Sequence, residues 1–151
     1  MTDTDAMFLI QTAIRATGLF SAVLAGRNPP ELDTTAASFP QCWLTLKGFK
    51  ERSLSDPECK QRDVTFTAVI TIQSDHSTTG EVGLDSLANS LSNALESATI
   101  PGLLPALSTF TAGDYPPAFT PPFATLQLTG GFSYLVDGFA GRSLPNLESA
   151  S

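Results

Sequence analysis

The stretch RDVTFTAVITIQ, residues 62–73, decides the fold. One parity of this stretch is polar apart from Val69, and the other is apolar, formed by Val64, Phe66, Ala68, Ile70 and Ile72. Successive side chains of a β-strand point to opposite faces of its sheet, so this period of two predicts a strand with one buried face. β-branched and aromatic residues dominate the stretch, and they favour a pleated sheet over a helix. We therefore expect the other elements to cover the apolar face.

Two further stretches have the same period of two, residues 39–49 and 123–136. Both alternate between apolar and polar side chains, so each predicts a half-buried strand. The second contains Gly130 and Gly131, which predict a bulge or a bend in the middle of the strand.

The strand at 39–49 places two aromatic residues, Trp43 and Phe49, on its polar face. Such a pair is either covered by the fold or presented as an anchor for a partner, since Trp is enriched at binding hot spots. Residues 48–61 then contain many turn-forming side chains and predict a long hairpin loop.

Two amphipathic helices are expected. Residues 1–17 carry an apolar stripe at three- and four-residue steps, with Asp3, Thr4 and Asp5 as N-cap oxygens and Gly18 as the stop. A second stripe follows Thr78-x-x-Glu81, a capping-box pattern, and ends by residue 99, before Pro101. Residues 19–24 read as a short extended segment and 26–38 as a loop.

The predicted fold class is α+β, a small and mainly antiparallel β-sheet with both helices packed on one face. The Pro-rich segment 101–122 is too apolar for a linker and is expected to pack over the sheet edge or over a neighbour. We predict one domain over residues 1–137 and a C-terminal tail over 138–151, either flexible or ordered on a partner.

The 151 residues carry a net charge of −7, which argues against non-specific binding of nucleic acid. Most of the basic residues nevertheless lie close together in the sequence: Lys47, Lys50, Arg52, Lys60 and Arg62. This basic stretch is either a charged docking surface or a solvated hairpin loop.

Catalysis has no positive support in the sequence. Phosphate-binding loops, dinucleotide fingerprints and nucleophile elbows are missing, and the single histidine, His76, reads as a turn residue. Cys42 and Cys59 lack metal-ligand spacing, so neither a metal nor a cofactor is expected. Without an apolar run of membrane-spanning length or a signal pattern, we expect a soluble protein made in a reducing cytoplasm.

The order of elements and several local phrases resemble the tail terminator family of long-tailed bacteriophages, also called minor tail protein U-like or tail-completion proteins. The phrases are TGLFSAV at the end of the first helix, the strands FPQCWLTLKG and VTFTAVITIQ around a hairpin, the helix LDSLANSLSNALES, and GDYPPAF before the strand ATLQLTGGFSYLV. The resemblance covers about residues 5–137.

The resemblance implies a non-enzymatic virion protein, assembled in the host cytoplasm. It would form a homohexameric ring at the head-proximal end of the tail, stop polymerisation of the tail tube protein and join a head-completion or connector protein. Genomic DNA would pass through the ring without specific binding, which suits an acidic protein.

From the sequence pattern we select the 48–61 loop and the 112–122 segment as contact surfaces. The candidate interface residues are Trp43, Lys47, Phe49, Lys50, Arg52, Lys60, Arg62, Asp114, Tyr115 and Phe119. Two other functions stay open: a different phage head–tail joining protein, or a small-ligand-binding α+β domain with a pocket beneath the Pro-rich segment.

Overall fold

A computed structural model describes residues 2–26, 39–54, 59–104, 110–116, 119 and 121–137. The elements are α1 (Asp3–Ala16), β1 (Ala22–Ala25), β2 (Gln41–Ser53), β3 (Cys59–Gln73), α2 (Ser77–Glu96), β4 (Phe110–Asp114) and β5 (Phe123–Asp137). The strands form one open sheet in the order β1-β2-β3-β5-β4. Among the described strands, β1 and β2 run parallel, and the other neighbouring pairs are antiparallel.

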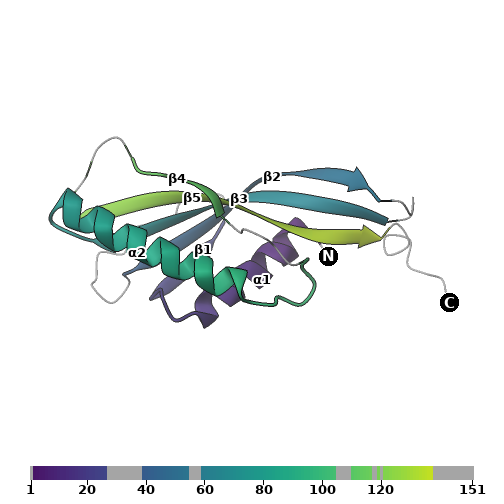
Figure 1. Ribbon diagram of the computed structural model, residues 1–151, viewed down its shortest axis with the longest axis horizontal. Helices are drawn as coiled ribbons and strands as arrows, with labels where there is room; N and C mark the ends of the chain where they lie inside the picture. Colours follow the sequence, from purple (N-terminus) through teal and green to yellow (C-terminus); the bar gives the residue numbers. More distant parts are fainter. Residues whose placement is uncertain are drawn as a thin grey trace.

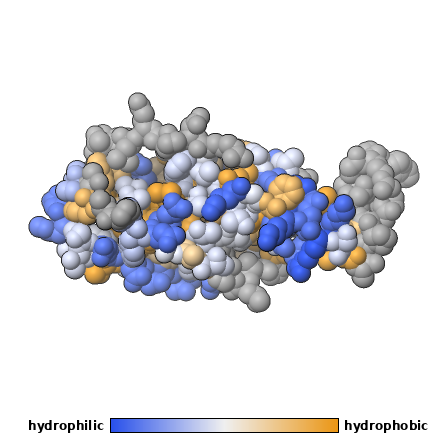
Figure 2. Space-filling model, turned by 90° about the horizontal axis from the view of Figure 1, so that it is seen from above, coloured by the Kyte–Doolittle hydropathy of each residue, from blue (hydrophilic) through white to orange (hydrophobic). Residues whose placement is uncertain are grey.

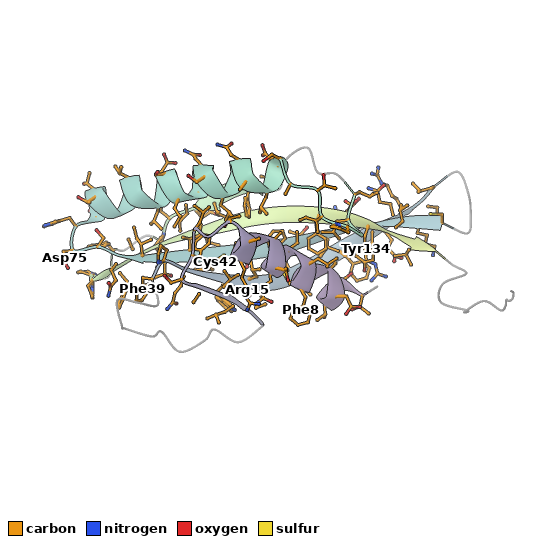
Figure 3. The ribbon with its side chains drawn as sticks, turned by 90° about the horizontal axis from the view of Figure 1, so that it is seen from below. Phe8, Arg15, Phe39, Cys42, Asp75 and Tyr134 are labelled. Atoms are coloured by element: carbon orange, nitrogen blue, oxygen red, sulfur yellow. The ribbon has the colours of Figure 1, made fainter. Side chains whose placement is uncertain are left out.

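Both helices lie on the same side of the sheet (Figure 1). This arrangement confirms the predicted α+β class with a mainly antiparallel sheet. The core fills the space between the helices and the apolar face of β3, where Val64, Phe66, Ala68 and Ile70 are buried. Figure 3 shows the side chains of this layer from the helix side. No helix in the described ranges is long and apolar enough to cross a membrane.

The N-cap of α1 lies one residue before the predicted cap residues Asp3, Thr4 and Asp5. Thr2 is the N-cap: its side chain accepts from the Asp5 amide at 3.1 Å, and the Asp5 carboxylate accepts from the Thr2 amide at 2.9 Å. This reciprocal pair is a capping box, and it lowers the pKa of Asp5. Gly18 follows the helix with a positive φ of 72°, the conformation expected of a helix stop.

The capping box predicted for the second helix is wrong. Helix α2 begins at Ser77, with His76 as an N-cap that makes no side-chain hydrogen bond. The chain enters α2 through Ser74, whose amide donates to the Pro122 carbonyl at 2.7 Å and whose hydroxyl donates to the His76 carbonyl at 2.8 Å. A tertiary contact therefore fixes the start of this helix.

The long hairpin loop predicted at 48–61 is also wrong. Strand β2 continues to Ser53 and β3 starts at Cys59, with pairing from Ser53↔Lys60 onward. The hairpin tip at 55–58, the loop at 27–38 and the C-terminal segment 138–151 lie outside the described residues.

The polar face assigned to Phe49 is wrong because β2 contains a bulge. The register between β2 and β3 shifts between Leu46 and Gly48, at Lys47. The extra residue reverses the alternation, so Phe49 pairs with Val64 on the helix face while Trp43 points to the opposite face.

The bulge predicted at Gly130 and Gly131 is not in β5. Pairing between β3 and β5 runs without a shift from Cys59↔Asp137 to Gln73↔Phe123. The irregularity lies on the neighbouring strand β4, between Phe110 and Ala112. Strand β4 belongs to the Pro-rich segment 101–122. It pairs with β5 and is itself an edge strand of the sheet.

Candidate interaction surfaces

Strands β2, β3 and β5 project beyond the helices as a long arm (Figure 1). We define the arm as residues 48–53 of β2, 59–65 of β3 and 131–137 of β5. Its strands pair from end to end, although most β2 side chains there are exposed. Val64, Phe132 and Tyr134 are buried at the base of the arm, and backbone pairing supports the part that extends beyond them.

On the helix face of the arm, Arg62 is the centre of a polar network. Its guanidinium donates to the Glu51 carboxylate through Nε at 2.8 Å and through Nη2, and it lies 4.0 Å above the Phe49 ring. It also donates to Asp3 Oδ1 at 3.2 Å, which ties the arm to the first turn of α1. The bond to Glu51 and, more weakly, that to Asp3 raise the pKa of Arg62 against the effect of burial.

On the opposite face, Asp63 is the centre of a second network. Its Oδ1 accepts from the Ser133 hydroxyl at 2.6 Å and from the side-chain amide of Gln61 at 2.9 Å. These two bonds lower the pKa of Asp63, and Arg52, 3.8 Å from Oδ2, adds to the effect. Arg52 and Arg62 thus face opposite sides of the arm.

The basic stretch therefore does not form one surface. Arg62 is occupied by its carboxylate partners, and the register places Lys60 on the same face. Lys50 and Arg52 point to the other face, and Lys47 lies at the bulge. Within the described ranges, Lys47, Lys50 and Lys60 form no ion pair, so these three cations remain exposed to solvent.

The outer edge of β2 is open along the arm. Strand β1 pairs with β2 only as far as Ala25↔Leu44. Beyond that point, residues 45–53 have β3 on one side and no described strand on the other. An unpaired edge of this kind can accept another strand unless charged side chains discourage it.

Trp43 is half-buried against the end of β1. Its indole Nε1 donates to the Gly26 carbonyl at 3.0 Å, and the Thr45 hydroxyl donates to the same carbonyl at 2.9 Å. The fold thus uses the polar atom of Trp43. Phe49, by contrast, is 51% exposed and keeps part of its ring available despite Arg62.

A groove of about 250 Å³ lies at the other edge of the sheet, between α2 and β4. Phe110, Leu126 and Leu128 contribute apolar side chains to its lining. The polar members of the lining are Asp85, Asn89, Ser92 and Tyr115. Burial raises the pKa of Tyr115, and the negative charges of Asp85 and Glu81 raise it further. The electrostatic potential at the groove is therefore negative.

Of the predicted contact residues in the Pro-rich segment, Tyr115 lines the groove and Asp114 ends β4 beside it. Phe119 is partly buried and packs against the core. Sequence reasoning missed the α2 side of the groove, Asp85, Asn89 and Ser92. Their three- and four-residue spacing on the polar face of α2 was the available signal, but it does not show that β4 lies opposite.

The two edges of the sheet differ in charge. The sequence has no Lys or Arg between residues 63 and 141, so every charged side chain on α2, β4 and β5 is acidic. The β2 edge instead carries Lys47, Lys50 and Arg52. Figure 2 shows the sheet side from above, where hydrophilic and hydrophobic residues are interspersed without a wide hydrophobic area among the coloured ones.

The described residues offer no metal centre, since no group of three or more His, Cys, Asp or Glu side chains converges there. Cys42 is buried and Cys59 partly buried, and both are free thiols. His76 is exposed at the start of α2.

No protein-family model matches the sequence, and a search of curated proteins finds no match.

Proposed function

We propose that this protein is a phage tail terminator. It forms a homohexameric ring at the head-proximal end of the tail, stops growth of the tail tube and joins a head-completion or connector protein. The proposed role is structural and involves no catalysed reaction. The ring is held by repeated contacts between copies, and DNA passes through its lumen without specific binding.

The observation that supports this proposal is the pair of unlike edges on one sheet. The basic, unpaired β2 edge and the acidic α2–β4 edge lie on opposite sides of the same subunit. A subunit with two different complementary surfaces makes head-to-tail contacts, and such contacts close into rings when the rotation permits. The resemblance in element order to tail terminators supplies the biological setting.

The acidic balance suits a DNA-conducting ring. A net charge of −7 repels the phosphate backbone and would prevent the genome from adhering during passage. The proposed role therefore needs acidic side chains on the inner surface of the assembled ring.

The first test is the mass of the purified protein, by light scattering over a range of concentrations and salt levels, with and without tube protein. We expect a closed species of six times 15.9 kDa, alone or on the tube. The second test is tube length: tube protein polymerised with the terminator should give tubes that stop growing. A ring that leaves tube length unchanged would contradict the proposed function.

A second candidate function rests on the groove between α2 and β4. Its apolar lining beneath part of the Pro-rich segment is a suitable surface for a small ligand. A protein that stays monomeric in the presence of tube protein and binds apolar compounds in this groove would favour a ligand-binding domain.

A further inference from the structure

We propose that the basic β2 edge of one copy docks against the acidic groove between α2 and β4 of the next copy. The inference rests on the ring in the proposed function and specifies the surfaces that hold it together. The occupant of the groove is thus a second copy of this chain.

The first half of the contact is the β2 edge at residues 45–53. Strand pairing leaves this edge open among the described residues, and Lys47 and Lys50 there have no ion-pair partner. Phe49 lies between the two lysines in the sequence, and its ring is 51% exposed on the helix face of the strand, opposite to Lys50. The edge therefore offers unused backbone groups, two unpaired cations and one aromatic ring.

The second half is the groove itself, which has matching features. Its apolar lining, with Phe110 and Leu128, can cover an aromatic ring, and Asp85 lies beside that lining. Asp114 follows at the end of β4. In the described structure neither Asp85 nor Asp114 makes an ion pair, and the surrounding sequence contains no cation to provide one.

Charge complementarity selects a second copy as the occupant. Opposite charges on two docking surfaces steer association and fix its register, whereas like charges there oppose association. Because the two surfaces lie on opposite edges of one sheet, a copy cannot satisfy its own groove with its own β2 edge. Each copy is left with one surface of each kind, as a head-to-tail assembly requires.

The test uses two charge-reversal variants. The edge variant carries Lys47→Glu and Lys50→Glu on the β2 edge; Arg52 is left in place because it already faces Asp63. The groove variant carries Asp85→Lys and Asp114→Lys. Each variant alone should self-associate more than about tenfold more weakly than the wild type, because like charges then meet at every contact.

Mixing the two variants in equal amounts gives the decisive measurement. The acidic β2 edge of the edge variant then meets the basic groove of the groove variant. The unchanged β2 edge of the groove variant meets the unchanged groove of the edge variant. Light scattering should therefore show a ring of alternating variants. The matched control is Asp75→Lys with Glu96→Lys, two exposed acidic residues away from the groove lining, which should assemble like the wild type.

A cross-link checks the same contact without reversing a charge on either side. In a Cys59→Ser background, the Lys50→Cys and Asp114→Cys double variant should oxidise to a ladder of linked copies. Neither single variant should do so beyond a dimer. The buried Cys42 stays in place as an unreactive thiol.

The outcomes separate this inference from the proposed function. Rings that form equally well from both charge variants would overturn the inference and leave the tail-terminator role standing. Rings that behave as expected but do not limit tube length would overturn that role and leave the contact standing. A wild-type protein that stays monomeric with and without tube protein would overturn both, and the lysines would then serve only to protect an open strand edge.

Discussion

The phenol of Tyr134, near the end of β5, donates a hydrogen bond to Asp3 Oδ1 in the first turn of α1 at 2.5 Å. Asp3 also accepts from Arg62 of β3. Figure 3 shows Tyr134 beside the N-terminal end of α1. One carboxylate thus links the first helix to two strands of the arm, and the arm is held at its base in one orientation relative to the core.

Removing the Tyr134 hydroxyl should destabilise the fold. Tyr134 is 1% exposed, and burial together with the bond to Asp3 raises its pKa to about 12. A hydrogen bond to a charged group is worth roughly 1.5–3 kcal/mol, and Asp3 keeps its bond to Arg62 in the variant. We expect Tyr134→Phe to lower the free energy of unfolding by about 1–2 kcal/mol, measured by urea denaturation.

The control is Tyr115→Phe, at a residue that is exposed beside the groove. This change should alter the unfolding free energy by less than about 0.5 kcal/mol. Equal stability of Tyr134→Phe and the wild type would show that the hydrogen bond between Tyr134 and Asp3 contributes nothing to the fold.

Two glycines of α2 should respond in opposite directions to alanine. A Cβ at Gly80 would lie 2.7 Å from the Cβ of Ala124, an atom that cannot move without its strand. We expect Gly80→Ala to destabilise the protein by about 1–3 kcal/mol, as overpacking does in cores.

Gly83→Ala is the matched comparison in the same helix. The added Cβ would meet only the end of the flexible Ile72 side chain, at 3.0 Å. Alanine in a helix interior is favoured over glycine by about 1 kcal/mol, so this variant should be neutral or slightly stabilised. Thermal unfolding of both variants measures the difference, and equal midpoints would contradict the tight contact between α2 and β5.

The sequence predicts the fold class because its strongest patterns mark the buried surfaces. Val64, Phe66 and Ile70 alternate without interruption, and the structure buries all three. The helical stripes are equally clear, since Ile10 and Leu91 face the same core. Periodicity reports burial, so the elements that bury a face could be found from the sequence alone.

The arm could not be predicted for the same reason. Its β2 side chains are exposed after the bulge, so no alternation marks residues 48–53 as a strand. Pairing with β3 extends the strand there, and pairing is a non-local property. The bulge at Lys47 has no apolar signal either, and it moved Phe49 to the face opposite Trp43.

The groove had to come from the structure as well. Asp85 and Tyr115 are far apart in the sequence, and neither belongs to an apolar pattern that would bring them together. They meet because β4 pairs with β5 across Gly113↔Leu128, and α2 lies on the same side of the sheet. The charge difference between the two edges was visible in the sequence, but the edges themselves were not.

The two cysteines should differ in reactivity. Cys42 is 0% exposed, and burial raises the pKa of its thiol to about 12, so almost no thiolate is present at pH 8. Cys59 is partly exposed at the start of β3. We expect a thiol-specific chromogenic reagent to modify one thiol rapidly in the native protein and the second only after denaturation.

Cys59→Ser identifies which thiol reacts. The fast phase should disappear in this variant, and the slow phase should remain and accelerate in guanidinium chloride. A native Cys59→Ser protein that still reacts rapidly would show that the core around Cys42 opens on the timescale of the assay.

The bond between Ser133 and Asp63 should give the arm a pH-dependent stability. Hydrogen bonds from Ser133 and Gln61 lower the folded-state pKa of Asp63 below its unfolded value of about 3.9. A lowered pKa adds stability above the unfolded value, and this contribution is lost as the pH falls through the folded value. Because the Asp63 side chain is 44% exposed, solvent screening keeps the contribution under about 1 kcal/mol.

Ser133→Ala should therefore be less stable than the wild type at pH 7, and the gap should narrow as the pH falls below about 4. Urea denaturation of both proteins at pH 7, 5 and 3 measures this difference. Ser53→Ala, an exposed serine on the same arm, serves as the control and should match the wild type at each pH. A gap that stays constant from pH 7 to pH 3 would mean that Ser133 acts by packing alone and that the charge of Asp63 does not stabilise the arm.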